Sequence, residues 1–273
     1  MAPGAATLGE ARVQELQAAS RVLGIADVVL LEYEDGMLPW VDAERLEADL
    51  RDTIRRLRPD VVITFGEDGL YGHPDHIAIH ERTTAAVAAL GKDTPALYYV
   101  TMPAGSMRAV IRHAEETLAT KRGAGGQSQH RILGIADPDA FGALAPPPTL
   151  VVDVSRFAAR KLAAIKCHRT QLEHDALALL ADSDAARLLG TEHFHRASVG
   201  ARGHAFIERF ASTLCGVVRQ RSRDITAGGE LELVEPRTSD SPVDRLRANG
   251  HVLKRQTHHT SERPSGRRST RRP

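Results

Sequence analysis

The sequence predicts an α/β fold built on a mostly parallel sheet. Helical segments alternate with short apolar runs between residues 11 and 172. Helix, strand, helix, strand at this spacing is typical of parallel strands joined by crossover helices. The apolar runs are rich in β-branched residues, as strands buried on both faces are. The composition fits a globular protein, because 42% of the residues are hydrophobic and 26% are charged.

Two helix and strand pairs open the chain. Residues 11–23 place apolar side chains at helical spacing, and Gly24 is a typical stop at a helix C-terminus. Residues 27–33, DVVLLEY, are expected to form a buried strand. A helix with a polar face follows over 42–57 and ends before a proline, and residues 60–65, DVVITF, form the second buried strand.

The same alternation continues through the middle of the chain. The pattern predicts a helix, a strand, a helix, a strand and a helix over 77–90, 96–100, 105–119, 149–155 and 156–172. Within residues 103–148, the glycine-rich GAGGQ and a triple proline indicate loops around the helix at 105–119. Beyond about residue 219 the periodicity fades, so we predict one domain over 1–218.

The formal net charge of +1 conceals a basic C-terminal segment. From Arg219 onward there are 13 Lys and Arg against 7 Asp and Glu, an excess of six positive charges, which leaves −5 for residues 1–218. The last eleven residues, RPSGRRSTRRP, carry five arginines and no acid. We expect residues 219–273 to be a disordered basic tail. Because no aromatic residues are interleaved with the arginines, we do not expect nucleic acid as a partner.

Several classes of protein are disfavoured by what the sequence lacks. It has no apolar run long enough for a membrane span and no N-terminal secretory signal, so a cytoplasmic protein is expected. Cys167 and Cys215 are isolated from one another and form no C-x-x-C pair, which indicates neither a disulfide framework nor a thiolate zinc site. The protein ligands of any metal ion must therefore be His, Asp or Glu side chains.

The segment GLYGHPDHIAIH, residues 69–80, follows the strand at 60–65. In open α/β sheets ligands bind at the carboxyl ends of the strands, which is where this segment is expected. Pro74 suits the first position of a helix, and an acidic residue beside it is favoured by the helix dipole. His76 and His80 share a helix face, and His73 lies just before them. Such imidazoles suit metal-assisted hydrolysis, but spacing alone leaves a metal site and an ordinary polar helix start equally open.

The stretch RPDVVITFGEDGLYGHPDHIAIH resembles the second signature of the PIG-L/LmbE-like zinc N-deacetylases. These enzymes remove acetyl groups from N-acetylglucosamine-containing glycoconjugates and related amides. ARVQELQAASRVLGIADVVLLEYEDG resembles the family's R-x-x-E-L-x-x-A segment with the strand and Asp-Gly that follow it. KLAAIKCHRTQ resembles the family's later K-x-x-A-x-x-x-H-x-x-Q helix, and GTEHFHR resembles its closing element. The resemblance covers roughly residues 5–200 and implies a Rossmann-like three-layer fold.

The resemblance assigns roles to four residues around the HPDH segment. It implies that His76 is a zinc ligand and that His73 acts as general acid or stabilises the tetrahedral intermediate. Asp75 would tune His73. Tyr71 matches a tyrosine that can reach the developing oxyanion.

Four further residues match more distant motifs. Arg12 and Asp35 correspond to positions that hold sugar hydroxyls in the sugar-specific members of the family. His168 and Gln171 match the later helix motif, for which helix packing is at least as good an explanation as a role in the site.

One family element is absent from the sequence. An Ala-His-Pro-Asp-Asp-Glu segment after the family's first strand supplies two of the three zinc ligands and the general base, and this chain contains no such segment. The fold is therefore expected to lack the family's first one or two strands. His76 alone is one ligand where a catalytic zinc needs three, and nothing in the sequence places His80, Asp68 or Glu67 around the same ion. We expect poor zinc binding. We also expect either that the natural reading frame starts upstream or that the gene is a decayed copy.

Three functions follow as hypotheses. The first is a zinc-dependent hydrolase that removes an acetyl group from an N-acetylated sugar or related amide, with a small molecule or glycoconjugate as substrate; the 273-residue chain would then be weakly active or inactive. The second is a catalytically silent relative that serves as a binding domain. The third is a binder of nucleic acid or an anionic surface through the basic tail. No short motif in the sequence identifies the particular substrate or the oligomeric state.

Overall fold

The computed structural model describes residues 7–91, 94–122 and 131–214. The described residues all belong to one unit of the chain, Met1–Asp224. The tail expected at 219–273 lies outside the described residues. In the described part of the chain, no helix combines the length and the apolarity that crossing a bilayer requires.

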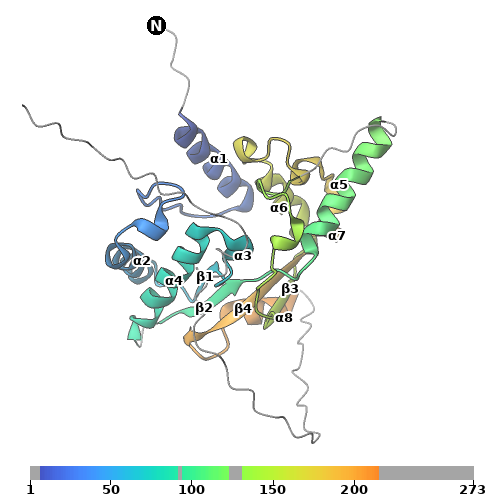
Figure 1. The fold of residues 1–273 in the computed structure, drawn as a ribbon. Helices are drawn as coiled ribbons and strands as arrows, with labels where there is room; N and C mark the ends of the chain where they lie inside the picture. The colour runs from blue at the N-terminus through green and yellow to red at the C-terminus, as the bar shows by residue number, and fades with distance from the viewer. Residues whose placement is uncertain (1–6, 92–93, 123–130, 215–273) are drawn as a thin grey trace, which may run out of the picture. The chain divides into compact units, whose positions relative to one another are not determined.

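A four-stranded sheet forms the centre of this unit (Figure 1). Its strands are β1 (Val61–Phe65), β2 (Ala96–Val100), β3 (Leu150–Asp153) and β4 (Thr191–Gly200), in the order β1-β2-β4-β3. Strand β1 pairs in parallel with β2, whereas β4 runs antiparallel to both β2 and β3. Three strands therefore point the same way and β4 is reversed. The expected α/β class and mostly parallel strand direction are confirmed, and β4 is a strand that the sequence pattern did not indicate.

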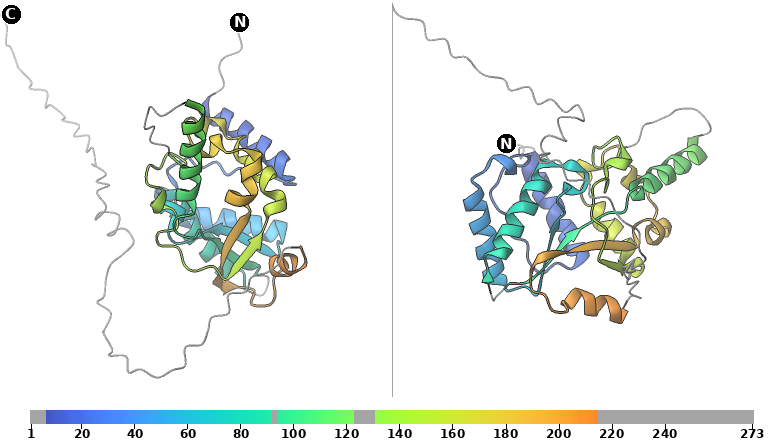
Figure 2. Two further views of the ribbon diagram at one scale, coloured as in Figure 1. Left: turned by 90° about the vertical axis from the view of Figure 1, so that its right-hand side faces the viewer. Right: turned by 60° about the horizontal axis from the view of Figure 1, so that its bottom comes forward.

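Helices cover both faces of the sheet (Figure 2). Leu97 of β2 packs with residues of α2 (Ala43–Leu57) and α4 (Pro74–Ala88) on one face. The next residue, Tyr98, points to the other face, where it packs near α8 (Phe206–Leu214) and donates a 2.6 Å hydrogen bond to Glu208. Alternation along β2 thus produces the three expected layers, because successive strand side chains point to opposite faces.

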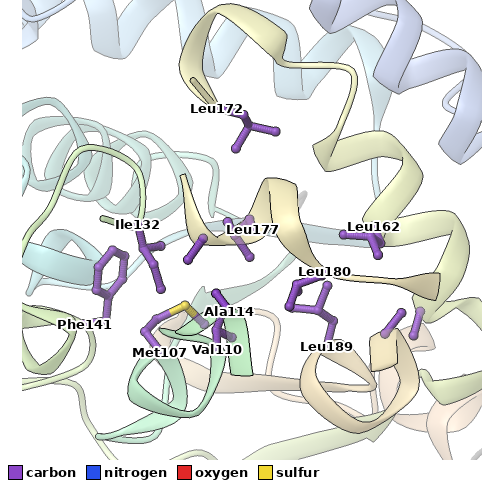
Figure 3. Packing of buried hydrophobic residues seen from close by; sticks show 13 residues of the cluster. Met107, Val110, Ala114, Ile132, Phe141, Leu162, Leu172, Leu177, Leu180 and Leu189 are labelled. Carbon is purple, nitrogen blue, oxygen red and sulfur yellow. The ribbon is translucent and has the colours of Figure 1, made fainter. Parts of the chain in front are cut away.

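A second core lies between α5 (Ser106–Arg122), α6 (Ala158–Ile165) and α7 (Asp182–Leu189). Figure 3 shows Met107 and Val110 beside Phe141 and Ile132 in this cluster. Leu70 and Tyr71, from the loop after β1, pack against the same cluster. The loop that carries the candidate site is therefore anchored on a hydrophobic core.

The predicted helices are present, and one of them is much shorter than expected. Helix α1 (Leu8–Leu23) has a capping box at Thr7 and ends at Gly24, which is left-handed with φ 75°. The helix predicted over 156–172 is shorter: α6 ends at Ile165, and a 3₁₀ turn follows over Arg169–Gln171. The N–H of Thr170 donates to the Glu15 side chain, 2.8 Å away, so it does not continue a helical ladder.

The prediction of a buried strand at 27–33 is wrong. These residues form no strand and pair with none of the described strands, and Val28, Val29 and Leu30 are 41%, 45% and 52% exposed. The apolar run has the composition of a strand buried on both faces, but burial requires neighbouring strands. Among the described residues, β1 is an edge strand of the sheet, and its Ile63 is 47% exposed.

Candidate active site

The loop after β1 has an unusual backbone that orients the site. Gly69 has φ 57°, and a Cβ added there would lie 2.8 Å from Cγ1 of Ile77, so glycine is required at this position. Leu70 is also left-handed, with φ 70°. Such a conformation costs energy in a leucine and is typical of loops whose shape serves a site.

His73 caps the N-terminus of α4. Its Nδ1 accepts a hydrogen bond of 3.2 Å from the N–H of Asp75. An imidazole nitrogen that accepts carries no proton, so the neutral ring has its proton on Nε2. His73 therefore presents an N–H donor at its free end.

His76 has the opposite arrangement. Its Nδ1 donates to the carbonyl of Gly69 at 3.1 Å, which leaves the lone pair on Nε2. The ring stacks on Phe65, the last residue of β1, with centroids 3.7 Å apart. Burial lowers the pKa of His76; this effect, with the neighbouring His73, outweighs the hydrogen bond to Gly69 and the charge of Asp75, which raise it. A neutral imidazole held by a backbone carbonyl is the usual form of a metal-binding histidine.

Tyr71 lies against both imidazoles. Its ring centroid is 5.8 Å from that of His73 and 5.4 Å from that of His76, and the two imidazole centroids are 4.5 Å apart. Burial raises the pKa of Tyr71, and the negative charge of Asp35 adds to this effect. The phenol therefore stays protonated and can donate a hydrogen bond.

The structure also brings the two expected sugar-binding residues together. Arg12 of α1 forms an ion pair with Asp35, although 23 positions separate them. The carboxylate of Asp75 accepts hydrogen bonds of 2.7 and 3.1 Å from the N–H groups of Gly36 and Leu38. Asp75 thus ties the turn that carries Asp35 to the helix that carries His76.

The described residues do not complete a set of metal ligands. Among them, no group of three or more His, Cys, Asp or Glu could hold a metal ion. His80 uses Nδ1 to contact the carbonyl of Phe65 at 3.0 Å, and Asp68 accepts from the N–H of Leu70 at 3.2 Å. A catalytic zinc needs three protein ligands, so the described residues fit one ligand of such a centre, His76, but not the centre itself.

His168 and Gln171 contact each other, with Nδ1 and Nε2 3.4 Å apart. Their segment is bonded to α1, where Glu15 accepts two hydrogen bonds from Thr170, rather than to the histidines of the HPDH segment. Sequence reasoning missed this role of Glu15. The available indication was that Glu15 and Thr170 both fall inside motifs already singled out.

Phe65 and Gly69 were also missed as parts of the site. Each orients the ring of His76, one through stacking and the other through its carbonyl. In the sequence, the only indication was that Phe65 ends the strand and that Gly69 lies between it and the histidines.

Comparisons with known proteins identify the family. Residues 2–87 match the family described as "PIG-L: GlcNAc-PI de-N-acetylase". A protein from Geodermatophilus obscurus, named 1D-myo-inositol 2-acetamido-2-deoxy-alpha-D-glucopyranoside deacetylase, is 34% identical over 229 residues, which cover 72% of this chain and 74% of the relative. A protein of the same name from Acidothermus cellulolyticus is 32% identical over 206 residues, 68% of each chain. The chain belongs to the PIG-L family.

Membership confirms the resemblance noted in the sequence. By family the protein is an enzyme, an amide hydrolase of the deacetylase type. Among solved structures, the conserved protein TT1542 from Thermus thermophilus aligns with a TM-score of 0.44 and 21% identity, over 74% of this chain and 79% of that one.

Proposed function

We propose that the protein binds an N-acetylated sugar and that the cluster of His73, His76 and Tyr71 serves to remove its acetyl group. One observation carries this proposal: two adjacent imidazoles present a donor and a lone pair at their Nε2 atoms. Hydrolysis of an amide is helped by a hydrogen-bond donor to the tetrahedral intermediate and by a site for an electron-pair acceptor.

Arg12 and Asp35 are proposed to hold the hydroxyls of the sugar. Their side chains are 38% and 76% exposed, so both can turn hydrogen-bonding atoms to a ligand while they remain paired. A guanidinium donates and a carboxylate accepts, which together match vicinal hydroxyl groups. The relatives' name, which specifies a 2-acetamido-2-deoxy-glucopyranoside of inositol, supports a GlcNAc-containing substrate.

The donors of His73 and Tyr71 are proposed to act on the amide itself. The Nε2–H of His73 would donate a hydrogen bond that stabilises the tetrahedral intermediate, and Asp75 would fix His73 through its backbone N–H. The protonated hydroxyl of Tyr71 would stabilise the negative charge that develops on the carbonyl oxygen.

We propose Zn²⁺ as the family's cofactor, with His76 as one ligand. The described residues offer no further ligands around His76. The 273-residue chain is accordingly proposed to turn over substrate weakly or not at all.

A second candidate function is a catalytically silent sugar-binding domain. The incomplete ligand set among the described residues favours it, since the paired Arg12 and Asp35 need no metal to bind hydroxyls. The two candidates share the binding step and differ in hydrolysis.

Two measurements on the same protein separate these candidates. Binding of N-acetyl-D-glucosamine is followed by NMR titration, and release of acetate from N-acetylglucosaminyl-inositol is measured with and without added Zn²⁺. Zinc-dependent acetate release that disappears in His76→Ala, but not in the exposed control His204→Ala, supports the hydrolase. Binding without acetate release supports the silent domain, and absence of both would refute the sugar assignment.

A further inference from the structure

Helix α1 carries Arg12, and its fully buried residues are small or polar, while Val13, Leu16 and Val22 are partly buried. Its buried residues are Glu15, Ala19 and Ser20, whereas Leu8 and Leu23 are 59% and 43% exposed. Nonpolar packing restrains a helix through large buried side chains, and Ala19 is the largest apolar contribution among these three. A directional polar interaction would add to this packing by fixing how α1 is rotated and where it stands along its axis.

Glu15 supplies such an interaction. One carboxylate oxygen accepts from the N–H of Thr170 and the other from its Oγ, both at 2.8 Å. Ser20, by comparison, bonds only to the carbonyl of Leu16 in its own helix. A carboxylate held through both oxygens fixes direction as well as distance, because two parallel hydrogen bonds allow little rotation.

The carboxylate of Glu15 is ionised at neutral pH. Burial raises the pKa of Glu15, but the two hydrogen bonds from Thr170 and the charges of His168 and Arg169 outweigh it, so that the pKa lies below its ordinary value. The bonds to Thr170 are therefore of the charge-assisted kind, which are shorter and stronger than those between neutral groups.

Arg12 lies three residues before Glu15, on the same side of α1. Its partner Asp35 sits on the turn whose Gly36 and Leu38 N–H groups bond to Asp75 of α4. Helix α1 thus stands between two fixed points: Thr170 on one side and the turn bonded to α4 on the other. A rotation of α1 that released Thr170 would also move Arg12 away from Asp35.

We propose that Glu15 is a positioning residue for the sugar site, which sets α1 through Thr170 so that Arg12 meets Asp35. The inference rests on the proposed sugar binding, and it assigns to the Glu15–Thr170 contact a role in affinity beyond the stability of the fold. A purely structural contact would lower the unfolding temperature but leave the affinity of the folded protein unchanged.

The test uses four variants of the full chain at a temperature where each is folded by circular dichroism. Glu15→Gln removes the charge, and Thr170→Val removes the hydroxyl while it keeps the backbone N–H. Thr170→Ser restores the hydroxyl, and Gln17→Ala, exposed on the same helix, is the control. The readouts are the dissociation constant for N-acetyl-D-glucosamine and the NMR resonance of the Arg12 Nε–H.

Glu15→Gln and Thr170→Val should each weaken sugar binding by roughly tenfold, the scale of one lost hydrogen bond to a charged group. Both should shift the Arg12 resonance, whereas Thr170→Ser and Gln17→Ala should match the original protein in both readouts. Folded Glu15→Gln with an unchanged Arg12 resonance and unchanged affinity would overturn the inference. If the original protein binds no sugar, the proposed function fails, and the Arg12 resonance alone then decides whether Glu15 positions Arg12.

Discussion

Phe65 and His76 lie face to face, with ring centroids 3.7 Å apart and planes inclined by 4°. One is the last residue of β1 and the other is in the first turn of α4. The stack therefore connects the sheet directly to the imidazole proposed to bind metal. It fixes the plane of that ring, and the hydrogen bond from Nδ1 to the carbonyl of Gly69 fixes how the ring is turned within that plane.

Phe65→Ala should destabilise the protein and release His76. Loss of the buried part of the ring and of its stacking partner should lower the free energy of unfolding by about 2–4 kcal/mol. Phe65→Leu keeps most of the volume and should cost about 1 kcal/mol. Urea unfolding of the two variants measures the difference, and equal stability of Phe65→Ala and the original protein would show that the stack contributes nothing.

Zinc binding by the 273-residue chain should be weak. A single imidazole supplies a fraction of the free energy of a site with three or four ligands, so the dissociation constant should be weaker than roughly 1 µM. Competition with a chromophoric chelator measures it, and His76→Ala should bind zinc more weakly still. Tight binding of one zinc per chain would mean that residues outside the described ranges complete the site.

Loss of the Asp75 carboxylate should destabilise the turn at residues 34–38 more than it destabilises helix α4. Asp75→Ala removes both acceptors of the Gly36 and Leu38 N–H groups and should cost about 1–3 kcal/mol of unfolding free energy. Amide hydrogen exchange should speed up at Gly36 and Leu38 in this variant. Glu81→Ala, on the exposed side of the same helix, is the control and should leave both amides protected.

The stability of the fold should depend on the protonation of Asp175. Burial raises the pKa of Asp175 in spite of the hydrogen bonds that it accepts from Leu177 and Leu133. The folded state then holds this proton more tightly than the unfolded state, whose carboxyl titrates near pH 4. The contribution to stability is thus complete below about pH 4 and is lost as the pH rises through the raised pKa.

Asp175→Asn cannot titrate, so it should lack this part of the pH dependence. Urea unfolding of both proteins between about pH 4 and about pH 7 should show the variant gaining stability relative to the original as the pH rises. A difference that stays constant over this range would rule out a raised pKa at Asp175.

Leu30 and Leu97 should respond very differently to truncation. Leu97 is fully buried in the sheet, and Leu97→Ala should cost about 2–5 kcal/mol. Leu30 is 52% exposed, and Leu30→Ala should change the unfolding free energy by less than about 1 kcal/mol. Denaturant unfolding tests both; a cost at Leu30 equal to that at Leu97 would mean that residues 27–33 are covered in solution.

The site could be predicted in part because its residues are close together in the sequence. The strand at β1, the loop and the histidines occupy one short segment, so their order along the chain places them at a strand end. The opposite roles of the two Nε2 atoms could not be predicted, because they depend on which backbone group meets each Nδ1. The partners of Glu15 and Asp75 lie 155 and at least 37 positions away.

The sequence by itself determined the α/β class, the bounds of strands such as β2, the C-terminal cap of α1 and the family. These depend on local backbone preference, apolar periodicity and motif spacing. Only the tertiary structure decided that residues 27–33 stay out of the sheet, that β4 joins it and that α6 stops at Ile165. The physical reason is that strand pairing and side-chain hydrogen bonds need a partner from elsewhere in the chain, and an apolar run specifies the need for burial without specifying the partner.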